Sequence, residues 1–566
     1  MALKDKIRKY ALQNAIKFNG KANPGAVIGK LLAEDPSLKQ KIKEISRDMQ
    51  AAVKEVNKMP LEEQAAELKR TAPELLEEKK KEEKKHELPE LKNAEKGKVV
   101  MRFAPSPSGP MHLGHAYAIS LSSEYCRKYQ GRLILRIEDT NPKNIYEPAY
   151  ELLKEDGKWI TKNNISEEII QSDRMGYYYD YAEKLIDMGK AYVCTCNSDE
   201  FKTLIFKNKE CPCRSLPKKE QQLRFAKMFA EYKPGEAVLR IKTDINHPNP
   251  AMRDFPLMRI NEHAHPRTGT KHRVWPLMNL AVFVDDAESG MTHIIRAKDH
   301  MDNAKRQEYL YKYFKKPVPE SLFVGRINFS DLRISCSKTK ALIEEGKYSD
   351  WDDIRLPFLL ALKRRGYQPD AFIKYALDVG LSQTDKTVSK DEFFKSLNHF
   401  NREVLDPIAN RYFFVADPTE IAIENAPEQE VSLDLHPDYP KRGERKFKTN
   451  NKFYIAKEDY KKIKEGELIR LMDCLNFTRK GNKFVFNSLE YEKYKEKGKL
   501  ILHWLPVQDN LVKTELLMPD NTVREGLAEH AVKKLKKEDI IQFERIGFCR
   551  LDQKEKDRLV FWYGHR

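Results

Sequence analysis

The strongest chemical signal in the sequence is a pair of histidines, His112 and His115, separated by Leu113 and Gly114. The apolar run 99–104 before them predicts a strand and the residues after them predict a helix, so the pair falls where a loop enters a helix. Amides at a helix N-terminus attract phosphate, imidazoles donate hydrogen bonds to it, and a glycine lets a flat base approach the backbone. The spacing therefore predicts a nucleotide site, against the alternative that either histidine only caps the helix or lies on the surface.

A second polar segment, Ser335-Cys-Ser-Lys-Thr339, lies far downstream. Lys338 carries a mobile positive charge that suits a triphosphate. Taken alone, Lys338 would be interpreted as an ordinary exposed lysine. Its interpretation therefore depends on the first segment.

Four of the eight cysteines are clustered in the sequence, as Cys194-Thr-Cys196 and Cys211-Pro-Cys213. Four thiolates can hold zinc in a closed tetrahedral site, although the C-x-C spacing is tighter than the usual C-x₂₋₄-C. The alternative is four reduced thiols that only pack together. The sequence leaves these two interpretations at even weight, and a disulfide framework is not expected in a chain of this size.

The elements around these residues alternate between strand and helix patterns. Gly131 is a candidate helix C-cap, and the alternating apolar residues of 133–137 predict a second strand, so the unit reads as strand, helix, strand of a parallel sheet. Residues 191–275 break this alternation and are interpreted as an insertion. The alternation resumes with the apolar runs 281–284 and 292–296.

Helical patterns flank this alternating region, and strands dominate the C-terminal end. An apolar stripe over 38–56 predicts a helix that Pro60 ends before a second helix begins, and the charge run 77–85 is interpreted as a solvated linker or helix end, with a domain boundary near 95. Residues 345–405 again appear helical in pattern. Strands are predicted at 412–415, 453–455, 468–470, 484–486, 500–504 and 559–562, with a hairpin turn at 480–482.

Composition narrows the class of protein. The 566 residues are enough for several domains, and the formal net charge of +17 suits a polyanionic partner, although a basic surface without nucleic acid would give the same value. No run of about 18 apolar residues exists and the first residues lack a signal-peptide apolar region. We therefore expect no membrane association and a cytoplasmic location.

Together, the two polar segments resemble the paired signatures of class I aminoacyl-tRNA synthetases. The second signature usually reads Lys-Met-Ser-Lys-Ser. Ser335 and Cys336 replace its first lysine and its methionine, whereas Ser337 and Lys338 match. The loss of the first lysine removes one phosphate contact that the family usually has.

Two longer segments, Arg102-Phe-Ala-Pro-Ser-Pro-Ser-Gly109 and Leu135-Arg-Ile-Glu-Asp-Thr-Asn-Pro142, look like the glutamate and glutamine branch of that class. Glutaminyl enzymes usually carry Pro-Glu-Pro-Asn-Gly where this chain has Ser106 between two prolines. Ser106 is therefore the glutamyl form, which agrees with the repulsion that a fixed carboxylate would exert on a glutamate side chain.

The resemblance implies roles for individual residues. Arg102 would pair with the substrate carboxylate and Glu138 would hold the α-ammonium, against the alternative that they form an internal ion-pair network. Met278 stands where many relatives place a pocket tyrosine. The full set implied is His112, His115, Ser337 and Lys338 for catalysis, Gly114, Arg326, Ile327 and Lys338 for ATP, and Arg102, Ala104, Ser106, Glu138 and Arg296 for glutamate.

The strand-rich C-terminal end resembles the archaeal and eukaryotic glutamyl-tRNA synthetases, with the archaeal type preferred, and Gly20-Lys-Ala-Asn-Pro-Gly-Ala-Val-Ile-Gly-Lys30 resembles their N-terminal extension. The expected fold is multidomain α/β plus all-β, with a Rossmann-type catalytic domain. The expected domains are a helical N-terminal extension (1–95), the first catalytic half (96–190), an inserted acceptor-stem-binding domain (191–275), the second catalytic half (276–340), a helical connector (341–405) and anticodon-binding β-barrels (406–566).

The function implied by the resemblance is ATP-dependent ligation of glutamate to tRNA(Glu) through a glutamyl-adenylate, with Mg²⁺ bridging the phosphates. Archaeal members commonly charge tRNA(Gln) as well, and a separate amidotransferase then corrects that product. The alternatives are a glutaminyl-tRNA synthetase, which Ser106 disfavours, and a small-molecule nucleotidyltransferase, which would not need the strand-rich end. A catalytically altered tRNA-binding paralogue is disfavoured by the retained His112, His115, Ser337 and Lys338.

Overall fold

The computed structural model describes residues 3–17, 20–34, 38, 42–75, 88–332 and 334–566, and the chain divides into two compact units, Met1–Lys85 and His86–Arg566. The predicted boundary near 95 falls inside the second unit, because Leu88 and Leu91 are buried in the core around the catalytic sheet. The charge run 77–85 lies outside the described residues. Within the described residues, no helix combines the length and apolar character needed to cross a membrane.

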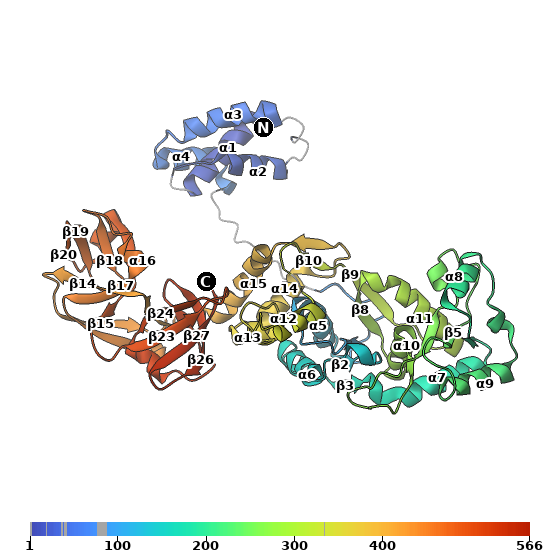
Figure 1. Ribbon diagram of the computed structural model, residues 1–566. Helices are drawn as coiled ribbons and strands as arrows, with labels where there is room; N and C mark the ends of the chain where they lie inside the picture. Colours follow the sequence, from blue (N-terminus) through green and yellow to red (C-terminus); the bar gives the residue numbers. More distant parts are fainter. Residues whose placement is uncertain (1–2, 18–19, 35–37, 39–41, 76–87, 333) are drawn as a thin grey trace. The chain divides into compact units, whose positions relative to one another are not determined.

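The described residues of the first unit form helices α1 (Leu3–Lys17), α2 (Pro24–Glu34), α3 (Ile42–Val56) and α4 (Leu61–Thr71) (Figure 1). The predicted apolar stripe is seen in α3, where Ile45, Met49, Val53 and Val56 are buried. This helix ends at Val56, before Pro60, which instead is the N-cap of α4. The fixed φ of proline suits that position at a helix start.

The catalytic region is built on parallel strands, as the sequence predicts. Strands β1 (Val100–Phe103), β2 (Arg132–Ile137) and β3 (Glu167–Ile170) form one parallel sheet, and β8 (His293–Ala297) pairs with β9 (Glu320–Val324). The two parts meet where Thr292 N donates to Val100 O at 3.0 Å. Helices α5 (Leu113–Lys128) and α6 (Ala149–Ile160) connect the first three strands, which gives the crossover connections that parallel strands require.

The prediction that Gly131 caps α5 is wrong in detail. The helix ends at Lys128 with Tyr129 as its C-cap, and Gln130 adopts the left-handed conformation with φ 51°. Gly131 is needed for a different reason, because a Cβ there would lie 2.3 Å from Val99 O. The glycine allows the chain to turn closely beneath β1 before it enters β2.

The region between the two catalytic parts holds an antiparallel sheet of β4 (Ala191–Cys194), β5 (Val238–Ile241), β6 (Pro256–Ile260) and β7 (Val274–Pro276), with helices α8 (Ser198–Phe206) and α9 (Lys218–Met228). A shared core packs this sheet against α7 (Met175–Asp187), α10 (Met278–Glu288) and α11 (Met301–Phe314). The apolar run 281–284 therefore lies in α10, whereas 292–296 supplies β8.

The connector is mostly helical, as predicted, with α12 (Cys336–Glu344), α13 (Leu359–Arg364), α14 (Pro369–Val379) and α15 (Lys390–Leu405). One short strand interrupts it. That strand, β11 (Lys386–Val388), pairs in parallel with β10 (Ile327–Phe329). The pairing attaches the connector to the edge of the catalytic region.

The C-terminal region consists of two seven-stranded sheets, in the orders β21-β18-β19-β20-β14-β17-β22 and β12-β25-β26-β27-β23-β24-β13, and the pair β15-β16 (Figure 1). The end strands of the second sheet, β12 and β13, are neighbours in sequence on either side of Phe413, so this sheet is nearly closed into a barrel. The predicted strand 412–415 is thus divided between them. The predicted hairpin turn is confirmed, with Gly481 at φ 60° between β19 and β20.

The bounds of the remaining C-terminal elements are β12 (Asn410–Tyr412), β13 (Phe414–Ala416), β14 (Pro418–Glu424), β15 (Gln429–Asp434), β16 (Glu444–Thr449), β17 (Lys452–Ala456), α16 (Lys457–Tyr460), β18 (Leu468–Leu471), β19 (Asn476–Lys480), β20 (Lys483–Ser488), α17 (Tyr491–Lys497), β21 (Gly498–Leu502), β22 (Leu505–Pro506), β23 (Val512–Leu517), β24 (Val523–Ala528), β25 (Ile540–Phe543), β26 (Gly547–Lys554) and β27 (Arg558–His565).

Candidate active site

A cavity of about 540 Å³ opens where β1 and β8 end and α5 begins. Parallel sheets commonly bind ligands at this carboxyl edge. Most of the predicted site residues line the cavity. They are Arg102, Ala104, His112, Gly114, His115, Glu138, Met278, Arg296, Arg326 and Ile327.

The two histidines are fixed by backbone hydrogen bonds at the start of α5. His112 Nδ1 accepts from Gly114 N at 3.1 Å and from His115 N at 3.4 Å, and His115 Nδ1 accepts from His112 N at 3.4 Å. The rings are stacked with centroids 3.7 Å apart. Since both Nδ1 atoms accept hydrogen bonds, each neutral ring carries its proton on Nε2.

Burial keeps these two rings neutral. It lowers the pKa of His112 to about 4 and the pKa of His115 well below its usual value. Gly114 between them is exposed at the cavity surface. The segment therefore offers a phosphate group two neutral Nε2–H donors and an exposed stretch of backbone. It does not offer the positive charge of an imidazolium.

The loop before the histidines is held from two sides. Met111 N donates to Asp156 Oδ2 at 2.9 Å, and Leu359 N of α13 donates to Met111 O at 2.8 Å. Asp156 is buried, and burial raises its pKa to about 7. These contacts set the position of His112 from α6 and from the connector.

Two arginines approach the same cavity from different strands, Arg102 from β1 and Arg296 from β8. Arg102 Nε lies 3.6 Å from Asp286 Oδ1, but that oxygen is already engaged by Arg136 Nη1 at 2.5 Å. Arg296 Nη1 donates to the neutral amide oxygen of Gln307 at 3.1 Å. The Nε atoms of Arg102 and Arg296 are both buried without a hydrogen-bond partner among the described residues.

The pKa values of both arginines are lowered, and burial is the largest cause. Burial lowers the pKa of Arg102, and burial together with repulsion from Arg102 lowers the pKa of Arg296 to about 10. Glu138 at the cavity accepts from Arg136 Nη2 at 3.0 Å. A carboxylate ligand would supply the missing charge and hydrogen-bond acceptors.

Three predicted residues are not among the described residues that line the cavity. Ser106, Ser337 and Lys338 are exposed. Ser337 and Lys338 lie in the first turn of α12, whose first residue Cys336 packs against Gly109, since a Cβ at Gly109 would lie 3.1 Å from Cys336 Sγ. The two signature segments are therefore in contact, although the roles of these three residues stay predictions.

Sequence reasoning did not assign roles to several residues at the site. Asp286 of α10 pairs with the arginines, and His300, Asn303 and Gln307 line the cavity from α11 and the turn before it. The only sequence signal was the acidic pair Asp285-Asp286 at the end of an apolar run. Its spacing gives no indication that one carboxylate pairs with arginines on two other elements.

The connector contributes to the wall where Arg326 lies. Asp385 Oδ1 accepts from Arg326 N at 2.8 Å, and Asp385 Oδ2 lies 2.7 Å from Lys298 Nζ, while the Arg326 guanidinium pairs with Asp299. Gly325 permits this approach, because a Cβ there would lie 2.3 Å from Thr384 O. These contacts with the connector thus fix the backbone of 325–327, which lines the cavity.

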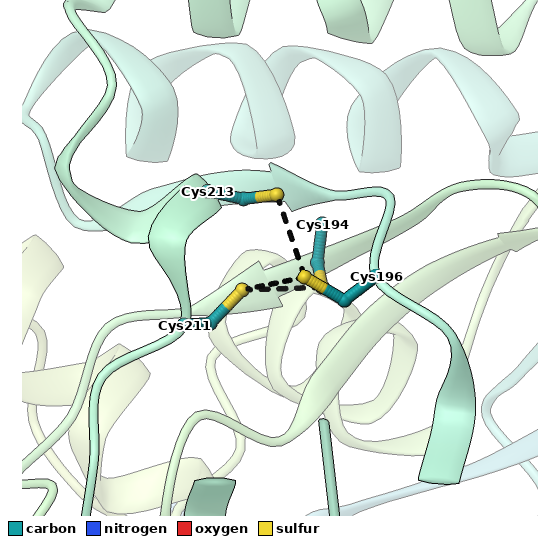
Figure 2. Close-up of side chains that lie close together, drawn as sticks. All are labelled: Cys194, Cys196, Cys211 and Cys213. Atoms are coloured by element: carbon teal, nitrogen blue, oxygen red, sulfur yellow. Dashed lines mark hydrogen bonds between the residues drawn. The ribbon is translucent and has the colours of Figure 1, made fainter. Parts of the chain in front are cut away.

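Figure 2 shows the four clustered cysteines, which come from the end of β4 and from the turn at 211–215. Their Sγ atoms lie within 4.8 Å of one another, with 3.6 Å from Cys194 to Cys211, 3.3 Å from Cys196 to Cys211 and 3.8 Å from Cys196 to Cys213. Four sulfurs at about 2.3 Å from a zinc ion would be about 3.8 Å apart, so this donor set fits the ion.

Neighbouring thiols in this cluster shift one another's pKa values. A hydrogen bond with Cys211 lowers the pKa of Cys194 to about 5, whereas burial raises the pKa of Cys196 to about 11. Four thiolates at these separations repel one another unless a cation lies between them. The cluster is therefore either a Cys₄ centre that holds a cation or a set of thiols of which some are protonated.

Comparison with known proteins places the chain in a family. Residues 98–407 match a family model described as tRNA synthetases class I (E and Q), catalytic domain. Residues 409–492 and 501–552 match two models described as anti-codon binding domains of the same group. The chain belongs to the class I tRNA synthetases of the glutamate and glutamine group.

Relatives narrow this class further. The chain is 47% identical to Glutamate--tRNA ligase of Thermococcus kodakarensis over 100% of both chains, and 44% identical to that of Methanobrevibacter smithii over 100% of both. It is 47% identical to Glutamate--tRNA ligase of Pyrococcus furiosus over 99% of each chain. The particular kind of synthetase that it resembles is thus the glutamate ligase. The family requires ATP and tRNA, and it usually uses Mg²⁺.

Proposed function

We propose that this protein attaches glutamate to the 3′ end of tRNA through a glutamyl-adenylate. The observation that carries the proposal is the pair of buried arginines, Arg102 and Arg296, which share a cavity with His112 and His115 and lack a full carboxylate complement. Glutamate has two carboxylates, one to be recognised and one to react. Full-length similarity to glutamate ligases supports the same substrate.

The reaction has two steps. A carboxylate oxygen of glutamate attacks the α-phosphorus of ATP and pyrophosphate leaves, and then the 2′-hydroxyl of the terminal adenosine attacks the mixed anhydride and AMP leaves. Neither step needs a nucleophile from the protein, so positioning and charge stabilisation carry the rate. The neutral Nε2–H groups of His112 and His115 would donate to phosphate oxygens, and Gly114 would let the base approach the backbone.

Lys338 and Ser337 complete this arrangement in the proposal. They lie at the start of α12, which packs against Gly109, and their exposure leaves them accessible to a bound triphosphate. Mg²⁺, when bound, would neutralise charge on the phosphates. Arg326 and Ile327 would contact the adenine, with Ala104, Ser106 and Glu138 positioned to hold glutamate.

We extend the proposal to tRNA(Gln), since the relatives compared come from archaea. A tRNA-dependent amidotransferase would then convert the misacylated product. The C-terminal sheets, which match anticodon-binding models, would select among anticodons. The proposed reaction serves protein synthesis, so the cytoplasm is the location that we propose.

The test is aminoacylation of tRNA(Glu) and tRNA(Gln) transcripts with glutamate and with glutamine. The expected result is charging of tRNA(Glu) by glutamate, with tRNA(Gln) also accepted, and about a hundredfold or more discrimination against glutamine because the amide leaves buried cations unpaired. Charging by glutamine alone would assign the glutaminyl reaction. Adenylate formation without any tRNA charging would indicate a nucleotidyltransferase, and no reaction would indicate a tRNA-binding paralogue.

We also propose that Cys194, Cys196, Cys211 and Cys213 hold structural zinc. Elemental analysis of the purified protein should find one zinc per chain, and Cys211→Ser should lose it and lower the melting temperature. Cys126→Ser is the matched control, because Cys126 is buried elsewhere and its replacement should keep the zinc. A metal-free native protein with full activity would identify the cluster as reduced thiols.

A further inference from the structure

One buried side chain beside the arginine pair has no role in the reaction described above. Gln307 lies on α11, is 3% exposed, and lines the cavity. Its Oε1 accepts a hydrogen bond from Arg296 Nη1 at 3.1 Å. It is thus in direct contact with an arginine proposed to bind the substrate.

The charge of Gln307 matters as much as its contact. Arg296 has no salt bridge among the described residues, and Asp286, whose charge acts on it, makes its side-chain hydrogen bond to Arg136 through Oδ1, while its Oδ2 makes none within the described residues. One turn further along α11, Tyr311 is also buried, and its hydroxyl has no hydrogen-bond partner in the described part of the chain. The helix therefore presents two uncharged groups to Arg296.

We propose that Gln307 is a positioning and specificity-determining residue, which orients Arg296 through a neutral acceptor and so keeps the pocket cationic for a substrate carboxylate. The inference rests on the proposed glutamate specificity. A guanidinium held by a neutral amide keeps its full charge available for the ligand. A guanidinium held by a glutamate would be neutralised before the ligand arrives.

This arrangement explains how the pocket can distinguish an acid from its amide. The two side chains of glutamate and glutamine have nearly the same shape, so packing discriminates little between them. The charge of the side chain must then determine which amino acid binds better. Each buried protein carboxylate near Arg296 would reduce the difference in binding between glutamate and glutamine. A neutral residue at 307 avoids that loss while still fixing the rotamer of Arg296.

Two substitutions separate the roles of charge and orientation. Gln307→Glu keeps the size and adds a carboxylate, and the KM for glutamate should rise about tenfold or more because two anions would compete for Arg296. The preference for glutamate over glutamine, as the ratio of kcat/KM values, should fall by a similar factor. Gln307→Met removes the acceptor without adding charge, so KM should rise severalfold with the preference largely kept.

The measurements are aminoacylation kinetics of tRNA(Glu) with each amino acid, with the KM for ATP as the internal check on folding. Gln50→Glu is the control, because it makes the same change at an exposed site on α3 of the first unit and should leave all constants unchanged. If Gln307→Glu keeps the wild-type KM and preference while the wild-type enzyme charges glutamate, the inference is wrong and the proposed function stands. If the wild-type enzyme does not use glutamate, the proposed function itself fails.

Discussion

Two buried arginine clusters in this molecule differ in how their charge is balanced. In the C-terminal region, Arg445 Nη1 lies 2.5 Å from Glu529 Oε2, its Nη2 lies 3.9 Å from Glu544, and its guanidinium lies over the Phe413 ring. In the catalytic cavity, Arg296 contacts only the amide of Gln307 through a side-chain hydrogen bond. Both arginines are almost fully buried.

The difference indicates what each cluster is for. Glu529 is 2% exposed and also accepts from Phe413 N at 2.7 Å, so its carboxylate balances the charge of Arg445 and holds the chain between β12 and β13, although Arg445 Nε and Glu529 Oε1 have no hydrogen-bond partner among the described residues. An arginine that is buried without its own carboxylate costs stability, and such a cost is kept where a ligand supplies the missing charge. We therefore interpret Arg445 as structural and Arg296 as ligand-binding.

The largest expected effect comes from breaking the balanced pair. Arg445→Leu leaves Glu529 buried without its partner, so the free energy of unfolding of the C-terminal region should fall by about 3 to 5 kcal/mol. The kcat/KM for glutamate of the folded fraction should change little. Thermal and urea denaturation, with activity measured well below the transition, would check both statements.

The double variant Arg445→Leu/Glu529→Leu is the control for that prediction. Replacing both charges by apolar groups removes the unpaired carboxylate and should recover most of the lost stability. If the double variant is no more stable than the single one, the loss comes from packing and not from charge.

The next largest effect is expected at Arg296 in the catalytic cavity, where a substitution should reduce activity more than stability. Arg296→Leu should lower kcat/KM for glutamate by about a hundredfold, because the substrate carboxylate loses its buried partner. The melting temperature should change by only a few degrees, since no protein carboxylate is left unpaired. A large loss of stability with an unchanged KM would instead assign Arg296 to the structural class of Arg445.

Some of this comparison could be predicted from the sequence. The motif resemblance predicts that Arg102, Glu138 and Arg296 share one pocket, and the structure brings them to one cavity because β1 and β2 are parallel and residues at the ends of β1, β2 and β8 line it. The four cysteines likewise come together as their spacing suggested. Local patterns are informative where strand ends or short turns fix the geometry.

Other parts could not be predicted, because they depend on packing between distant elements. Gln307 has no distinguishing neighbours in sequence, and its role follows from how α11 packs beside β8. The short apolar run 281–284 is compatible with a strand or a buried helix, and only the tertiary fold decides for α10. The sequence likewise could not show that Leu88 and Leu91 belong to the second compact unit, because the other members of their core lie far along the chain.

The smallest expected effect concerns the neutral histidines of the catalytic cavity. His112 has a pKa of about 4 in the folded chain, below the ordinary value of 6.5, so the unfolded state binds more protons between these values. Stability that is fully present above pH 6.5 is therefore lost as the pH falls toward 4, by about 1 kcal/mol between pH 7 and 5.5 for this one residue. The pH dependence of the free energy of unfolding should become shallower in His112→Gln, whereas His263→Gln, at an exposed position, should leave it unchanged. If the pH dependence of His112→Gln is as steep as that of the wild-type protein, burial does not keep this ring neutral. The contrast between charged arginines and neutral histidines in one cavity would then be wrong.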